Sequence, residues 1–293
     1  MPKIINAAFA LALGSAVAAL TTTAQAQTAP APGPITVVRS EAGIAPVIPA
    51  MIEPLTTGGL LDSLLVTNQP FSTVFDSETV QTRAGGTPVT TRVVTKIYRD
   101  AAGRTRREQN FYPAGATPGA NDAAQSVSIY DPVARWKYSL NAAARTAERY
   151  KLPTALPTGA IFNNQVPLVT RIFRNENPQT GTVAAYTLSA PVLLPLGNQT
   201  IAGGAASGWR VTMRVPAGAL GNSTAMDAVY EMWFALDLKL LVKCTVTNPT
   251  SGSHTLLART ISRTAPAAAL FTVPADYTTR EMGTVRTDLA PPR

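Results

Sequence analysis

Hydrophobic and polar residues alternate along most of this chain with the two-residue period that is typical of β-strands with one buried face. Segment 209–215 shows the pattern most clearly, and it recurs in segments 225–234 and 240–246. In the first of these the apolar positions are Trp209, Val211, Met213 and Val215, and the polar positions are Arg210, Thr212 and Arg214. We therefore predict strands that turn one face to a core and the other to solvent.

Short turn signals separate consecutive strands, which predicts that neighbours in sequence pair in an antiparallel way. Gly103 is a clear example, because glycine can adopt the positive φ that closes a hairpin. We expect segment 271–274 to end the fold. The predicted strands cover residues 71–82, 89–99, 105–112, 126–130, 136–140, 146–151, 166–173, 183–194, 209–215, 225–234, 240–246 and 255–261.

Helical signals are few. Residues 58–66 contain Leu60, Leu61, Leu64 and Leu65, a spacing that favours one short amphipathic helix packed on a sheet. The pattern as a whole predicts a mainly β protein, with a large curved antiparallel sheet and one or two short helices. With so few helices, much of the apolar face of the sheet has no predicted cover. The Pro-containing connection 152–165 is a candidate seam between two subdomains.

The N-terminus has the parts of a secretory signal peptide: Lys3, an apolar run over residues 7–20, and the small residues Ala24 and Ala26. The rival interpretation, a membrane anchor, needs an apolar run of roughly 18 to 20 residues, and this one is shorter. We predict cleavage after Ala26, which makes 1–26 the signal peptide, 27–57 a Pro- and Ala-rich leader and 58–293 the β domain. The mature protein is then expected to be soluble, and periplasmic or extracellular.

The cysteine content and the net charge restrict how the fold can be stabilised and which partners it is expected to bind. Cys244 is the only cysteine, so a hydrophobic core must stabilise the fold without internal disulfides, and its apolar neighbours predict that it is buried. Removal of Lys3 leaves 24 of the 25 basic residues against 17 acidic ones, a net charge of +7. The basic residues are dispersed along strands, which is typical of a solvated face, so we expect no nucleic-acid partner.

Candidate catalytic residues are scarce. His254 is the only histidine and follows the turn at Gly252, where we expect it to be solvated. One histidine and one cysteine cannot form the usual zinc site, and neither a nucleophile elbow nor a phosphate-binding glycine loop occurs. We therefore expect no metal, cofactor or catalytic residue. Four carboxylates in or beside strands leave a hydrolase open: Glu108, Asp131, Glu148 and Glu231. Neighbouring arginines favour cross-strand ion pairs for Glu108 and Glu148 instead.

A set of short motifs occurs in order over about residues 71–281: residues 98–108, 129–132, 136–140, 197–203, 215–222, 231–234 and 270–277. Together they resemble a group of uncharacterised exported proteins of soil acidobacteria. That group is loosely similar to the periplasmic lipoprotein carriers such as LolA and LolB. The resemblance implies an incomplete β-barrel wrapped over helices, with a concave apolar surface that holds acyl chains. It transfers no functional residue, and the turn 248–250 and segment 267–269 lack the charges expected of the closer relatives.

Two classes of function follow. The first is binding of a lipophilic ligand or an acylated partner on the apolar concave face of the sheet. An ordinary aromatic core would use the same side chains. The second is a non-catalytic structural or interaction module of the cell envelope, dimeric through that face. The candidate ligand-binding residues are Trp136, Tyr138, Trp209, Met213, Met232 and Phe234.

Overall fold

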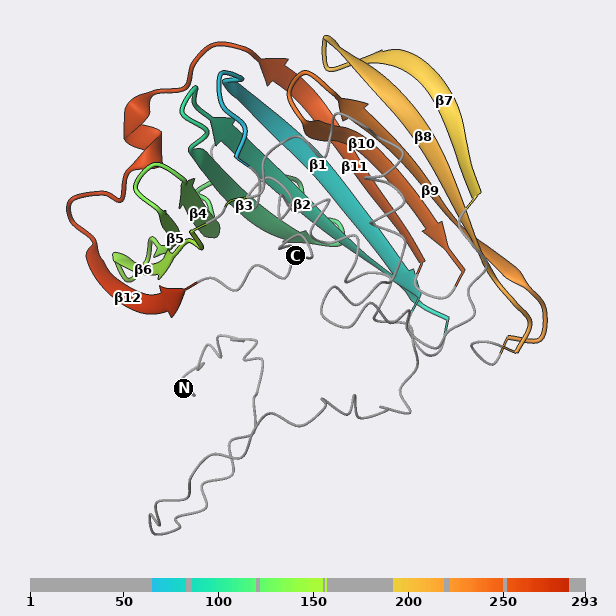
Figure 1. The fold of residues 1–293 in the computed structure, drawn as a ribbon. Coiled ribbons are helices and arrows are strands. Elements are labelled where there is room, and N and C mark those ends of the chain that lie inside the picture. Colours follow the sequence, from blue (N-terminus) through green and yellow to red (C-terminus); the bar gives the residue numbers. More distant parts are fainter. Residues whose placement is uncertain are drawn as a thin grey trace, which may run out of the picture. The chain divides into compact units, whose positions relative to one another are not determined.

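A computed structural model describes residues 65–82, 86–119, 122–154, 156, 192–218, 222–249 and 252–284. These residues form one hydrogen-bonded sheet of twelve strands (Figure 1). The predicted signal peptide, leader and strand 166–173 lie outside the described residues, as does most of the predicted seam. The strands are β1 Phe71–Thr82, β2 Pro88–Arg99, β3 Thr105–Pro113, β4 Ser126–Asp131, β5 Trp136–Asn141, β6 Thr146–Lys151, β7 Val192–Ile201, β8 Gly204–Val215, β9 Met226–Ala235, β10 Leu240–Asn248, β11 Gly252–Ser262 and β12 Thr278–Thr284.

The strand order shows how the chain builds the sheet. It runs β12-β6-β5-β4-β3-β2-β1-β11-β10-β9-β8-β7, so β1 to β6 form one meander and β7 to β11 form another. Antiparallel pairing of β1 with β11 joins the two meanders in the middle of the sheet. The sheet is curved and is not closed into a barrel, with β7 and β12 at its two edges (Figure 1). The predicted fold class is therefore confirmed.

The end of the fold was predicted wrongly. Segment 271–274 is followed by β12, which lies beside β6 at the edge of the sheet and pairs with it in parallel. All seven residues of β12 are exposed, so the strand has no buried face and no alternation to reveal it. The chain between β6 and β12 includes β7 to β11, so it is long enough to bring the two strands side by side in parallel. The connection from β11 to β12 contains the 3-10 helix η3, Ala268–Phe271.

The predicted helix over residues 58–66 is described only at its end. Leu65 forms an isolated β-bridge there and Val66 is not helical. The backbone carbonyl of Val66 lies 3.0 Å from the position that a Cβ on Gly103 would occupy, and Gly103 has φ +85°. The hairpin predicted at Gly103 is confirmed, and a glycine is needed there both for its conformation and for this close approach.

Two hydrophobic cores lie on opposite faces of the sheet. The large core draws on β1, β2 and β7 to β11, and the small core is built from Val127, Ile129, Leu140 and Ala147. Register fixes the faces: Ile129 lies opposite Arg106, Arg106 opposite Tyr98, and Tyr98 opposite Ser72. Ser72 adjoins Phe71 of the large core along β1, so the two point to opposite sides. The only helical segment among the described residues, η3, contacts β3 and β4 at the small-core end.

Candidate functional site: the apolar face of the sheet

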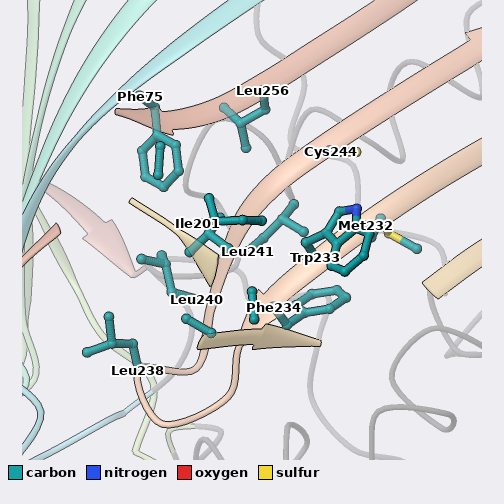
Figure 2. Close-up of a cluster of buried hydrophobic side chains, with 14 of the residues drawn as sticks. Phe75, Ile201, Met232, Trp233, Phe234, Leu238, Leu240, Leu241, Cys244 and Leu256 are labelled. Carbon is teal, nitrogen blue, oxygen red and sulfur yellow. The ribbon is translucent and has the colours of Figure 1, made fainter. Parts of the chain in front are cut away.

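One face of the central strands is continuously apolar. We call it the apolar face, and its side chains are each exposed by only 0–5%. Cross-strand register arranges them in rows, for example Met232 opposite Cys244 and Cys244 opposite Leu256 (Figure 2). The face thus runs from β8 through β9, β10 and β11 to β1. Its members are Phe75, Val211, Met213, Ala228, Tyr230, Met232, Phe234, Cys244, Val246, Leu256 and Ala258.

Four of the six candidates from the sequence come together on this face. Met213, Met232 and Phe234 belong to it directly. Trp209 lies opposite Met232 in the register of β8 and β9 and is partly buried against the large core. Two methionines add flexible, polarizable side chains that adapt to irregular apolar partners.

The other two candidates, Trp136 and Tyr138, lie elsewhere. Both belong to β5, and Tyr138 lies opposite Ile129 and packs on the small core, on the other face of the sheet. The Arg149 guanidinium lies 4.3 Å from the centroid of the Trp136 ring. The structure therefore does not join these two residues to the apolar face.

Cys244 lies within the apolar face, as predicted, and is exposed by 1%. Burial raises the pKa of its thiol to about 12. The thiol is therefore protonated at neutral pH, and a protonated thiol is a poor nucleophile and metal ligand. Cys244 acts as a small apolar side chain, as its strand neighbours indicate.

His254 was predicted wrongly to be solvated. It lies opposite both Thr79 and Val246 and is only partly exposed, because alternation along β11 turns it to the same face as Leu256. Its Nδ1 lies 2.8 Å from the Thr79 hydroxyl oxygen. Its Nε2 is buried and has no hydrogen-bond partner among the described residues. Burial lowers the pKa of His254 to about 4, so the imidazole is neutral at physiological pH.

The opposite face of the central strands is polar. Its cross-strand ion pairs join Arg210 to Glu231 at 2.6 Å and Arg92 to Glu78 at 2.8 Å. A groove of about 510 Å³ on β1, β2, β10 and β11 is bordered by Glu78, Arg92 and Pro118. Arg259 also contributes to its wall through a bidentate pair with Asp76. This is the solvated face that the alternation predicts.

Cross-strand ion pairs were predicted for Glu108 and Glu148, whereas each carboxylate has a partner on its own strand. Glu108 accepts a hydrogen bond from Arg106 of its own strand at 2.7 Å, and Glu148 accepts one from the Tyr150 hydroxyl at 2.8 Å. Asp131 accepts hydrogen bonds from two backbone N–H groups, those of Val133 and Ala134, in the β4–β5 turn. Arg106 and Tyr150 each lie two residues from their carboxylate on the same strand, and so reach Glu108 and Glu148 without crossing to a neighbouring strand.

Glu108 and Glu231 do not form a hydrolytic pair of the kind considered above. Four strands separate β3, which carries Glu108, from β9, which carries Glu231. At about 4.8 Å per strand the two residues are roughly 24 Å apart along the sheet. Glycoside hydrolases place their two carboxyl groups about 5–10 Å apart. Within the described ranges no three or more His, Cys, Asp or Glu side chains gather so as to hold a metal ion.

No helix in the part of the chain that the structure describes is long and apolar enough to cross a membrane. No protein-family model and no curated protein matches the sequence. Solved structures do match. In the MucA/MucB complex of Pseudomonas aeruginosa, the matched chain is 15% identical, with a TM-score of 0.34 and coverage of 83% of this chain and 66% of that one.

Two further solved structures match. The lipoprotein LppX of Mycobacterium tuberculosis is 14% identical with a TM-score of 0.25, over 72% of this chain and 93% of that one. The LolA superfamily protein NE2245 of Nitrosomonas europaea is 10% identical with a TM-score of 0.23, over 74% of this chain and 97% of that one. This chain spans 60–66% of the MucB chains that it matches. The likeness to the LolA superfamily is loose and concerns the fold alone.

Proposed function

We propose that this chain is exported and binds a lipophilic ligand, or the acyl chain of an acylated partner, on the apolar face. The observation that carries the proposal is the continuity of that face across five adjacent strands, from β8 to β1. Neighbouring strands lie about 4.8 Å apart, so the face extends roughly 20 Å across the sheet, enough for an extended acyl chain to lie on it. The only helical segment among the described residues packs at the small-core end instead.

The chemistry of the face suits a hydrocarbon. Its residues offer aliphatic, aromatic and thioether groups, and each CH₂ group that leaves water gains about 0.8 kcal/mol. Met213 and Met232 can change rotamer to accommodate chains of different shape. Specificity for one acyl chain length is therefore not expected from the face alone.

A ligand can bind only when the apolar face opens. The side chains of the face are exposed by 0–5%, so a ligand has to displace the atoms that cover them. The free energy of that displacement subtracts from the gain of burying the acyl chain. We expect measured affinities to be well below those that the buried apolar area alone would give, and exchange of ligand to be slow.

The test is native mass spectrometry of the mature protein purified without detergent, followed by lipid extraction of the same sample. We expect a bound species that extraction identifies as an acylated molecule, and uptake of added palmitate by the emptied protein. Met213→Gln, on the apolar face, should weaken palmitate uptake at least fivefold. Its neighbour Thr212→Gln, on the opposite face, is the matched control and should not. An emptied, folded protein that takes up no palmitate would contradict the proposal.

A specific observation favours a second candidate, an envelope interaction module. Val192 and Leu194 lie on the polar face of β7, opposite Thr212 and Arg210, and are exposed by 66% and 50%. Exposed apolar side chains side by side are typical of protein contacts. Sedimentation equilibrium tests this: a dimer that Leu194→Glu dissociates would support the module, and a monomer at high concentration would contradict it.

A further inference from the structure

We propose that His254 is the polar anchor of the apolar face: its Nε2 donates a hydrogen bond to an acyl oxygen of the bound ligand. This inference rests on the proposed function and adds the class of ligand, an acyl ester or another acyl carbonyl compound as opposed to a plain hydrocarbon. It also gives the ligand a direction, with its oxygen end at the row that contains Thr79 and His254.

His254 lies beside two residues of the apolar face. On β11 it precedes Leu256 by two residues, so both side chains lie on the same side of the strand, and its neighbour across the pair with β10 is Val246. Leu256 and Val246 are each exposed by 3% and belong to the large core. His254 is thus a hydrogen-bonding group at the border of an otherwise apolar surface.

One ring nitrogen of His254, Nε2, has no hydrogen-bond partner among the described residues. Nδ1 of His254 lies 2.8 Å from the Thr79 hydroxyl, while Nε2 is buried without a hydrogen-bond partner among the described residues. The Thr79 hydroxyl can donate to Nδ1, and in that tautomer the ring proton of the neutral imidazole is on Nε2. A buried N–H without an acceptor costs free energy that an incoming acceptor recovers. A carbonyl oxygen is such an acceptor, and an alkane offers none.

The uncharged state of the ring supports a neutral oxygen acceptor. Burial holds the pKa of His254 near 4, so the ring carries no charge to attract a phosphate or a carboxylate at neutral pH. His254 is the only histidine in the sequence, so no other imidazole can take its place. An ester carbonyl is uncharged and can accept the single hydrogen bond that Nε2 offers.

The experiment compares methyl laurate with pentadecane, which have the same number of non-hydrogen atoms, each delivered from cyclodextrin to the mature protein without a histidine tag. We expect the ratio of methyl laurate affinity to pentadecane affinity to be about tenfold higher in the native protein than in His254→Phe, the gain that one hydrogen bond to a buried donor provides. The ratio between the two proteins cancels the difference in hydration between the two probes, and His254→Phe should keep the pentadecane affinity of the native protein. Thr79→Val should lower the preference, and Thr255→Val, on the opposite face of β11, should keep it.

A direct readout does not depend on the fold of a variant. Because His254 is the only histidine, ¹⁵N-histidine labelling gives one pair of ring nitrogen resonances. Methyl laurate should shift the Nε2 resonance, and pentadecane should not. Binding of both probes with an unchanged Nε2 resonance, or an ester preference that survives in His254→Phe, would overturn this inference and leave the proposed function standing. Binding of neither probe would instead overturn the proposed function.

Discussion

The guanidinium of Arg99 donates a hydrogen bond to the backbone carbonyl of Leu238, with the two atoms 2.7 Å apart. Arg99 ends β2 and Leu238 lies in the turn between β9 and β10, so this side-chain bond joins the two meanders in addition to the pairing of β1 with β11. Arg99 is exposed by 1%, also donates to the Gln69 carbonyl, and lies 4.6 Å from the centroid of the Phe71 ring. Burial lowers its pKa to about 10, and it remains charged at neutral pH.

Arg99→Met should destabilise the fold by about 2–4 kcal/mol, because the Leu238 carbonyl in a buried contact and the Gln69 carbonyl in a partly buried one lose their donor. Urea unfolding followed by circular dichroism measures the change. The matched control is Arg92→Met on the same strand, whose ion pair with Glu78 is exposed. An exposed pair of this kind contributes less than about 1 kcal/mol. Equal effects of the two substitutions would contradict the role given to Arg99.

Gly208→Ala should also destabilise the protein, because the indole of Trp233 occupies the space beside this glycine. A Cβ on Gly208 would lie 2.5 Å from the Cε3 atom of Trp233, closer than atoms pack. We expect a cost of about 1–3 kcal/mol, as for an overpacked core. Gly204→Ala on the same strand is the control, since its nearest contact would be an ordinary 3.7 Å. In a Trp233→Leu background, Gly208→Ala should lower the free energy of unfolding much less, because the clashing indole is gone. If the effects of the two substitutions simply add in the double variant, the clash with Trp233 is not the cause.

The titration of His254 predicts a loss of stability in acid. Its pKa is about 4 in the folded protein and about 6.5 in an unfolded chain. Between these values the unfolded state binds the extra proton, so stability is full above pH 6.5 and falls as the pH drops toward 4. The difference corresponds to at most about 3 kcal/mol. Urea unfolding from pH 7 to pH 4 should show a shallower decline for His254→Phe than for the native protein, and parallel curves would disprove the assignment.

Cys244 should not react with Ellman's reagent in the folded protein, because its thiol is buried and its pKa is raised to about 12. In denaturant it should react fully. A control cysteine placed at Leu257, on the exposed side of the neighbouring strand, should react at once in the folded protein, since that side chain is exposed by 47%. Rapid reaction of native Cys244 would show that the apolar face opens readily, and would revise the slow exchange expected of a ligand.

Local pattern was sufficient to predict most of the strands. The bounds of β1 and β6 agree with the prediction at both ends, because each strand is flanked by clear turn residues. The start of β8 was missed, since residues 204–208 contain only glycine, alanine and serine and show no apolar alternation. β12 was missed for a related reason, as it buries no side chain.

Long-range relationships could not be predicted from the same pattern. Alternation assigns side chains to two sides of one strand, but it does not say which side of a distant strand they share. Trp136 and Trp209 were therefore grouped, although the sheet places them on opposite faces. The partial burial of His254 depends on its position between Thr79 and Val246, and the pairing of β1 with β11 that creates this position leaves no local signal in the sequence.

Quenching of tryptophan fluorescence by a brominated acyl chain tests most directly whether the apolar face binds lipid. Trp209 borders the apolar face, while Trp136 and Trp233 lie on the other side of the sheet. The measurement titrates 12-bromostearate into Trp136→Phe/Trp233→Phe, which keeps Trp209, and into Trp209→Phe/Trp233→Phe, which keeps Trp136, with unbrominated stearate as the blank. We predict saturable quenching of Trp209 and none of Trp136. Quenching of Trp136 alone, or of neither tryptophan in the folded protein, would contradict acyl binding on the apolar face.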